Sequence, residues 1–183
     1  MRLPMTLTFT RLLLIPVFVL VFYLPSVWAN FFAAIIFALA GITDWLDGYL
    51  ARRLKQSSAF GAFLDPVADK LMVVIALIFM VSSPYFHYTA LPAAIIAGRE
   101  ITVSGLREWM AELGKRASVA VSYVSKVKTT MQIVAIVTLL AATPIMPKFL
   151  TDIGYILLYI AAGLTLWTMC MYLKAAWPDF TME

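Results

Sequence analysis

Six long apolar segments dominate this sequence of 183 residues and limit the folds that are open to it. They occupy residues 6–28, 31–52, 60–81, 90–111, 117–140 and 152–174. A helix that crosses the hydrocarbon core of a bilayer needs about 20 mostly apolar residues, so each segment is long enough. Only short connections remain between them. We therefore expect one all-α domain over residues 1–183, a polytopic membrane protein with six transmembrane helices.

The composition excludes the usual soluble classes. Hydrophobic residues make up 63% of the chain and charged residues only 13%, whereas soluble domains carry about 25% charged residues. The single cysteine, Cys170, cannot form an intrachain disulfide and belongs to no cysteine-rich metal motif. The few charged residues are therefore the place to look for function.

The basic residues predict the orientation of the helices. Lys148 alone lies on one predicted side, and all other basic clusters flank the opposite side. These clusters comprise Arg2, Arg11, Arg52, Arg53, Lys55, Lys115, Arg116 and Lys174. Cytoplasmic loops carry the excess of Lys and Arg, so both termini should be cytoplasmic. The net charge of +4 then reflects orientation and attraction to anionic lipid, and we expect no nucleic-acid partner.

The first apolar segment also has features of a signal peptide. Arg2 and Arg11 resemble its basic region, and Val27 and Ala29 have the spacing of a cleavage site. The apolar run is long for such a peptide. We expect an uncleaved helix.

Four acidic residues fall where lipid-spanning helices should be apolar. Asp44 and Asp47 are three residues apart near the end of the second segment, and Asp65 and Asp69 are four apart near the start of the third. Both spacings place side chains on one face of a helix. Because a short turn joins these antiparallel helices, the four carboxylates should converge near the cytoplasmic side.

Such a cluster indicates a metal site. An ionised group inside a bilayer costs at least about 2.5 kcal/mol and usually marks a functional site. Arg52 and Lys70, the nearest bases along the chain, are too few to neutralise four acids. Oxygen ligands favour Mg²⁺, Mn²⁺ or Ca²⁺, and one or two ions would leave a site able to accept a phosphate. The alternative is acids paired with lysines that hold helices together.

Small residues and one base flank the acids. Gly48, Ala51 and Gly61 could let a flat or phosphorylated ligand approach the backbone, or could simply allow close helix packing. Arg52 could bind a phosphate or anchor the chain at the cytoplasmic surface.

The acidic segment resembles the signature of the CDP-alcohol phosphatidyltransferase family. Every fixed position of that signature is filled here, in the order Asp44-x-x-Asp47-Gly48-x-x-Ala51-Arg52-x8-Gly61-x3-Asp65-x3-Asp69. Residues 60–70, 99–101, 106–115 and 126–130 are similar to the bacterial phosphatidylglycerophosphate synthase branch of the family. The start, Pro4 to Arg11, also resembles that branch, although Met5 replaces its usual Asn.

The resemblance implies a six-helix bundle, often a homodimer, in the bacterial inner membrane. It implies that Asp44, Asp47, Asp65 and Asp69 hold one or two Mg²⁺ or Mn²⁺ ions that bind the pyrophosphate of CDP-diacylglycerol. Asp69 would also be the catalytic base that deprotonates sn-glycerol 3-phosphate. Nucleotide-binding positions would be Gly48, Ala51, Arg52 and Gly61.

A phosphate-bearing acceptor requires further cations. Arg99, Arg107, Lys126 and Lys128 lie in predicted cytoplasmic halves of helices and are candidates for binding that phosphate. Their alternative role is to reach the lipid headgroups with long side chains. Glu100 and Glu108 could pair with these cations, which would make even Arg99 structural.

Two other functions fit part of the sequence. A sister enzyme would join CDP-diacylglycerol to serine or inositol phosphate, and the signature does not distinguish these acceptors. An ion-coupled transporter would also place acids in the membrane. Transporter sites, however, lie near the midplane between internal repeats, and no repeat is visible here.

Overall fold

Six helices form the whole regular structure of the described residues. The computed structural model describes residues 3–54, 59–112, 114, 123–142 and 147–180, with the backbone alone at 3–8, 45–54, 59–63, 65, 66, 69, 123–126 and 178–180. The helices are α1 (Leu3–Phe22), α2 (Ala29–Leu54), α3 (Ala59–Ser82), α4 (Ala90–Glu112), α5 (Tyr123–Ala141) and α6 (Lys148–Phe180). No strand occurs in these ranges, which confirms the all-α prediction.

The first and last helices end elsewhere than predicted. Helix α1 stops at Phe22 instead of 28, because Pro25 follows and the chain turns through short bonds, from Leu24 N to Val21 O at 3.1 Å and from Ser26 N to Leu24 O at 2.7 Å. Helix α6 begins at Lys148 instead of 152, directly after a proline, and continues to Phe180.

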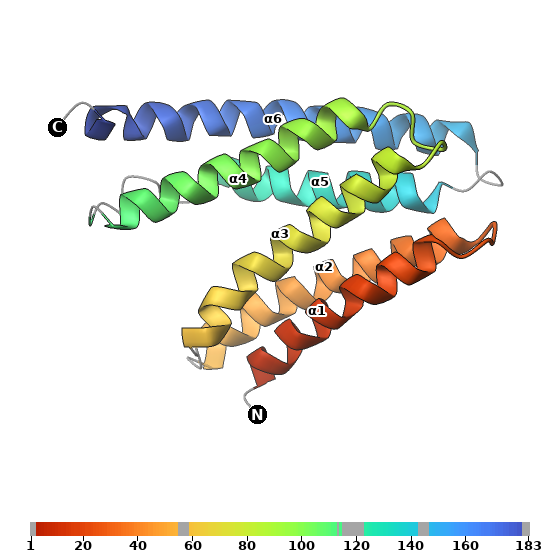
Figure 1. The fold of residues 1–183 in the computed structure, drawn as a ribbon, viewed down its shortest axis with the longest axis horizontal. Coiled ribbons are helices and arrows are strands. Elements are labelled where there is room, and N and C mark those ends of the chain that lie inside the picture. The colour runs from red at the N-terminus through yellow and green to blue at the C-terminus, as the bar shows by residue number, and fades with distance from the viewer. Residues whose placement is uncertain (1–2, 55–58, 113, 115–122, 143–146, 181–183) are drawn as a thin grey trace.

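The helices run back and forth between two ends of the molecule. Helices α1, α2 and α3 form a slanted group, and α4, α5 and α6 lie beside one another (Figure 1). The start of α1, the end of α6, the junction of α2 with α3 and that of α4 with α5 all lie toward the same end. At that end α4 closes with Gly114, whose φ of 73° is the left-handed conformation that favours glycine after a helix.

The core is built from small and large apolar residues on all six helices. Alanines recur through it, among them Ala33 and Ala34 on α2, and they let helices approach closely. Helix α5 approaches α6 closely at Gly154, where an added Cβ would lie 2.7 Å from Leu139 Cγ. Glycine is required there because any side chain would overlap its neighbour.

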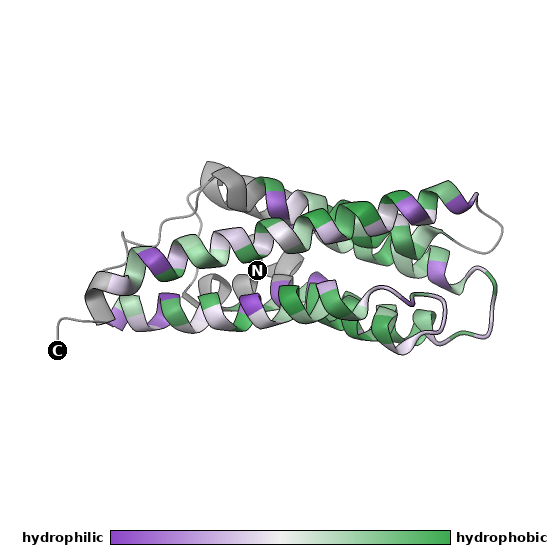
Figure 2. Cartoon of the chain, turned by 90° about the horizontal axis from the view of Figure 1, so that it is seen from above, coloured by the Kyte–Doolittle hydropathy of each residue, from purple (hydrophilic) through white to green (hydrophobic). Residues whose placement is uncertain are grey.

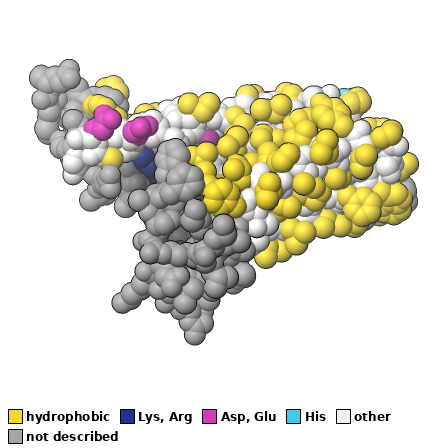
Figure 3. Space-filling view, turned by 60° about the horizontal axis from the view of Figure 1, so that its bottom comes forward, with side chains coloured by type: hydrophobic (Ala, Val, Ile, Leu, Met, Phe, Trp, Pro, Cys, Tyr) yellow, Lys and Arg dark blue, Asp and Glu magenta, His cyan; other side chains and the backbone are white. Residues whose placement is uncertain are grey.

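Large apolar side chains also cover the outside. Leu20 is 70% exposed and Ile101 is 76% exposed. Figure 3 shows hydrophobic side chains across most of the described surface on one face, with charged ones toward one end. Figure 2 likewise shows hydrophobic residues along most of each helix, with hydrophilic residues more frequent toward the end that holds the C-terminus. Apolar surfaces of this extent mark contact with lipid or with other proteins.

One helix among the described residues has the length and composition of a membrane span. Residues Lys148–Trp177 are long and apolar enough to cross. Shorter apolar runs lie within α1, α2, α3 and α5. The apolar run of α4 is interrupted by Arg99, Glu100 and Arg107. The six-span topology therefore remains a prediction, whereas the six helices are confirmed.

Candidate active site

The four predicted metal ligands lie on two consecutive helices. Asp44 and Asp47 belong to α2, and Asp65 and Asp69 belong to α3. Because both segments are helical, each pair lies on one face of its helix. The side chains of Asp47, Asp65 and Asp69 are outside the described residues, so the convergence of all four carboxylates stays a prediction.

The predicted nucleotide-binding residues lie on the same two helices. Gly48, Ala51 and Arg52 are on α2, and Gly61 is on α3. Lys126, a predicted acceptor residue, is on α5. Beyond their helical backbone, these residues are outside the description, and their roles remain predictions.

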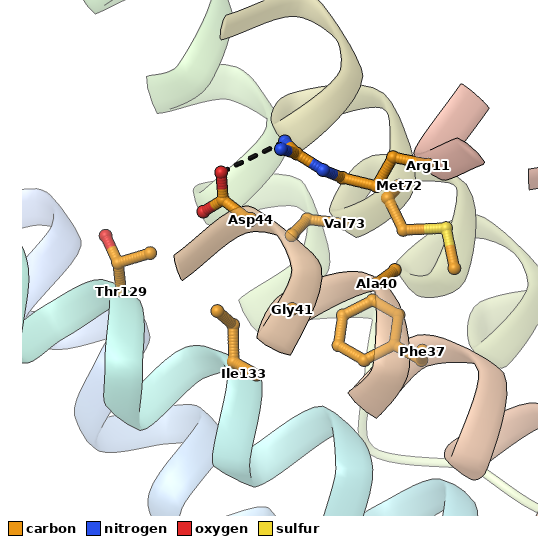
Figure 4. A pocket seen from close by; sticks show the side chains of 9 residues that line it. All are labelled: Arg11, Phe37, Ala40, Gly41, Asp44, Met72, Val73, Thr129 and Ile133. Atoms are coloured by element: carbon orange, nitrogen blue, oxygen red, sulfur yellow. Dashed lines mark ion pairs between the residues drawn. The ribbon is translucent and has the colours of Figure 1, made fainter. Parts of the chain in front are cut away.

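Asp44 forms an ion pair with a cation from a third helix. Its Oδ1 lies 3.0 Å from the NH1 nitrogen of Arg11 on α1, as Figure 4 shows. The Arg11 side chain is 2% exposed, whereas that of Asp44 is 43% exposed. The carboxylate can therefore meet solvent or a ligand while its partner is enclosed. Arg11, which the sequence assigned to the orientation of the chain, thus contacts the first of the four predicted metal ligands.

A pocket of about 90 Å³ adjoins this ion pair. It lies between α1, α2, α3 and α5, and its walls are largely apolar (Figure 4). Besides Arg11 and Asp44, the lining residues are Phe37, Ala40, Gly41, Met72, Val73, Thr129 and Ile133. The charged pair thus lines one side of a small, largely apolar space inside the bundle.

A second charged group lies between α4 and α5. Glu100 Oε1 is 2.7 Å from Arg99 NH1 and 3.5 Å from Lys128 Nζ. The side chains of Arg99 and Lys128 are 8% and 2% exposed, so neither reaches out to a headgroup layer. Glu100 therefore does pair with the predicted acceptor cations, and one carboxylate is shared by two of them.

Tyr172 on α6 joins a further cation to this group. The guanidinium carbons of Arg99 and Arg107 lie 5.8 Å and 5.4 Å from the centroid of its ring. Arg107 NH2 also lies 3.4 Å from the Tyr172 hydroxyl, a long hydrogen bond. We call Arg99, Glu100, Arg107, Lys128 and Tyr172 the cation cluster. Three of the four predicted acceptor residues are members, so the structure brings these three together.

Lys70 connects the acid-bearing helix to this cluster. Its ammonium donates a hydrogen bond to Ser104 Oγ on α4. Ser104 in turn donates to the Glu100 carbonyl oxygen at 2.5 Å. Lys70 directly follows Asp69 on α3. These hydrogen bonds therefore connect α3, next to a predicted metal ligand, to the part of α4 that carries Glu100.

The sequence did not predict the ion pair of Arg11 with Asp44, nor the contacts of Ser104 and Tyr172 with residues of the cation cluster. Arg11 did carry a signal, since it ends the segment that resembles the bacterial branch. Tyr172 carried none, because a tyrosine near the end of an apolar segment is ordinarily an interface residue. His87 is exposed between α3 and α4.

The donor set suits a hard divalent ion. No group of three His, Cys, Asp or Glu side chains forms a metal site among the described residues, and Asp44 is the one predicted ligand whose side chain is described there. That one, Asp44, lines the pocket with an oxygen donor. The other three are also carboxylates, the ligands that Mg²⁺ and Mn²⁺ prefer.

The chain is similar to known proteins along almost its entire length. It is 54% identical over 178 residues to a protein of Shigella flexneri and to one of Escherichia coli, covering 97% of this chain and 96% of each relative. A Yersinia enterocolitica protein is 54% identical over 180 residues, with coverages of 98% and 97%. All three are named CDP-diacylglycerol–glycerol-3-phosphate 3-phosphatidyltransferase. The family model described as CDP-alcohol phosphatidyltransferase matches residues 1–167, and the chain belongs to this family.

Proposed function

We propose that this chain transfers the phosphatidyl group of CDP-diacylglycerol to sn-glycerol 3-phosphate, yielding phosphatidylglycerophosphate and CMP in phospholipid biosynthesis. The observation that carries the proposal is 54% identity, across 97% of the chain, to relatives named for this reaction. The enzyme is thus a transferase with one lipid-linked substrate and one water-soluble substrate.

The cation cluster supports a phosphate-bearing acceptor. Arg99, Arg107 and Lys128 supply three positive charges, and Glu100 is the only carboxylate among the described residues of the cluster. The surplus matches a phosphate monoester, which carries about −1.5 to −2 charge at neutral pH. Guanidinium groups suit phosphate because their donors match its oxygens in pairs. Serine, which has no phosphate, would not need this surplus.

The acidic residues are proposed to carry out the transfer. Asp69 accepts the proton of the attacking glycerol hydroxyl. That oxygen forms a bond to the phosphorus that bears the lipid, the bond from this phosphorus to the bridging oxygen breaks, and CMP leaves with the electron pair. One or two Mg²⁺ or Mn²⁺ ions, held by Asp44, Asp47, Asp65 and Asp69, would neutralise phosphate oxygens and the leaving group. Gly48, Ala51, Arg52 and Gly61 are proposed to contact the nucleotide.

We place the chain in the bacterial inner membrane, with six spans and both termini cytoplasmic. The exposed apolar side chains of the helices support contact with lipid. The basic clusters support the orientation. A homodimer rests on the family resemblance alone.

Purified protein and a panel of alcohols test the proposal. With CDP-diacylglycerol and Mg²⁺ or Mn²⁺, CMP should be released when sn-glycerol 3-phosphate is present and not with serine or inositol phosphate. Addition of EDTA should stop the release, and excess Mg²⁺ should restore it. Release of CMP with serine or inositol phosphate, and not with sn-glycerol 3-phosphate, would assign the chain to a sister activity.

A further inference from the structure

Tyr172 lies close to two arginines of the cation cluster. Its ring is within 5.8 Å of both guanidinium carbons, and the residue itself is only 6% exposed. Val103, Leu106, Met110 and Ala176 form an apolar cluster with it. The ring therefore has little freedom to move, and α6 presents it to two positions of α4 that lie two helical turns apart.

Two guanidinium groups near one ring repel each other, so a group that attracts both is needed to hold them there. Glu100 pairs with Arg99, and among the described residues it forms no ion pair with Arg107. The Nε atoms of Arg99 and Arg107 are buried without a hydrogen-bond partner in the described part of the chain. The described residues thus leave part of the hydrogen-bonding capacity of these two arginines unused.

An aromatic ring holds a cation differently from a carboxylate. The negative face of the ring attracts the cation, yet the ring carries no net charge. If position 172 carried a carboxylate in addition to that of Glu100, it would also hold Arg107. It would, however, cancel positive charge that could bind a phosphate dianion. A tyrosine retains the positive surplus of the cluster.

We propose that Tyr172 is a positioning residue for the acceptor: its ring holds Arg99 and Arg107 in place, without neutralising them, to bind the phosphate of sn-glycerol 3-phosphate. This inference rests on the proposed function. Tyr172 acts through the two arginines and takes no part in the chemical step. Its removal should therefore weaken acceptor binding and leave the rate at saturation nearly unchanged.

The test compares Tyr172→Leu, Tyr172→Phe and Tyr159→Leu in the full-length purified enzyme. Tyr159 is the control because it lies on the same helix and is 43% exposed. Loss of the ring in Tyr172→Leu should raise KM for sn-glycerol 3-phosphate about tenfold, in the range of a buried cation–π contact. Both kcat and KM for CDP-diacylglycerol should change less than about twofold. Tyr172→Phe keeps the ring and should stay within about threefold of the wild type.

A double-mutant cycle shows whether Tyr172 acts through Arg107. If it does, adding Tyr172→Leu to Arg107→Gln should raise KM for sn-glycerol 3-phosphate far less than it does alone. Additive effects would overturn the proposal, and so would an unchanged KM or an equal effect of Tyr159→Leu. If Tyr172→Leu fails to fold, Tyr172→Met fills the space without a ring and takes its place in the same cycle.

The wild-type arm separates the two hypotheses. If the wild type releases CMP with sn-glycerol 3-phosphate and the Tyr172 variants behave like it, only the positioning role is lost. If the wild type does not use this acceptor, the proposed function fails and the positioning role fails with it.

Discussion

Arg11 on α1 places its NH1 nitrogen 3.0 Å from Oδ1 of Asp44 on α2. Asp44 is the first acid of the family signature, so the N-terminal helix is tied directly to the predicted metal site. The pair is asymmetric, because the arginine is enclosed and the carboxylate is nearly half exposed. An open carboxylate with a buried counter-charge suits a ligand that must remain available to an ion.

This asymmetry predicts unequal effects of removing either partner. Asp44→Ala leaves a buried guanidinium without the charge of its carboxylate and should destabilise the fold by about 1–3 kcal/mol. Arg11→Met leaves a carboxylate that water can reach and should destabilise less. Thermal unfolding in detergent, followed by tryptophan fluorescence, measures both. Asp152→Ala, at an exposed site on α6, is the control, and a lower Tm for Arg11→Met than for Asp44→Ala would contradict this account.

Asp69→Asn should abolish turnover while CDP-diacylglycerol still binds. The amide cannot accept the proton of the attacking hydroxyl, and loss of a general base reduces rates by about 10²- to 10⁴-fold. CMP release measures turnover, and equilibrium binding of CDP-diacylglycerol measures the site. Asp152→Asn should behave as the wild type. Full activity of Asp69→Asn would refute the assignment of the base.

Lys128→Met should weaken binding of the acceptor. The ammonium is almost fully buried beside Glu100. The hydrogen bond that it would donate to the charged phosphate of the acceptor contributes about 1.5–3 kcal/mol. KM for sn-glycerol 3-phosphate should therefore rise at least about tenfold, with KM for CDP-diacylglycerol unchanged. Lys148→Met removes an exposed lysine and serves as the control. Equal KM values for the two variants would show that Lys128 is structural.

Gly154→Ala should loosen the packing of α5 against α6. The added methyl would lie 2.7 Å from Leu139 Cγ and 3.3 Å from the Leu139 backbone nitrogen, so the helices must separate. Such overpacking costs about 1–3 kcal/mol. Gly163→Ala meets nothing within 4 Å and should leave Tm unchanged or raise it. Thermal unfolding of the two variants side by side tests this, and equal Tm values would show that the contact relaxes freely.

The helices were largely predictable because long apolar runs leave few other folds. Their ends were less so: α1 stops at Phe22 because Pro25 breaks the bonding pattern, although the apolar run continues. The acid spacing was equally local, and helices α2 and α3 keep each pair on one face. For the acceptor cations, residue type and depth suggested Arg99, Arg107 and Lys128 individually, but not the carboxylate and ring that join them.

The six helices, the acidic signature and the family were predictable from the sequence, since these depend on residue type and on spacing along one helix. In contrast, it is the packed bundle that shows Arg11 facing Asp44 and Tyr172 facing Arg99 and Arg107. The physical reason is that pairing across helices depends on how helices rotate and slide against each other. Packing of the whole bundle sets that rotation, and no spacing within one segment records it.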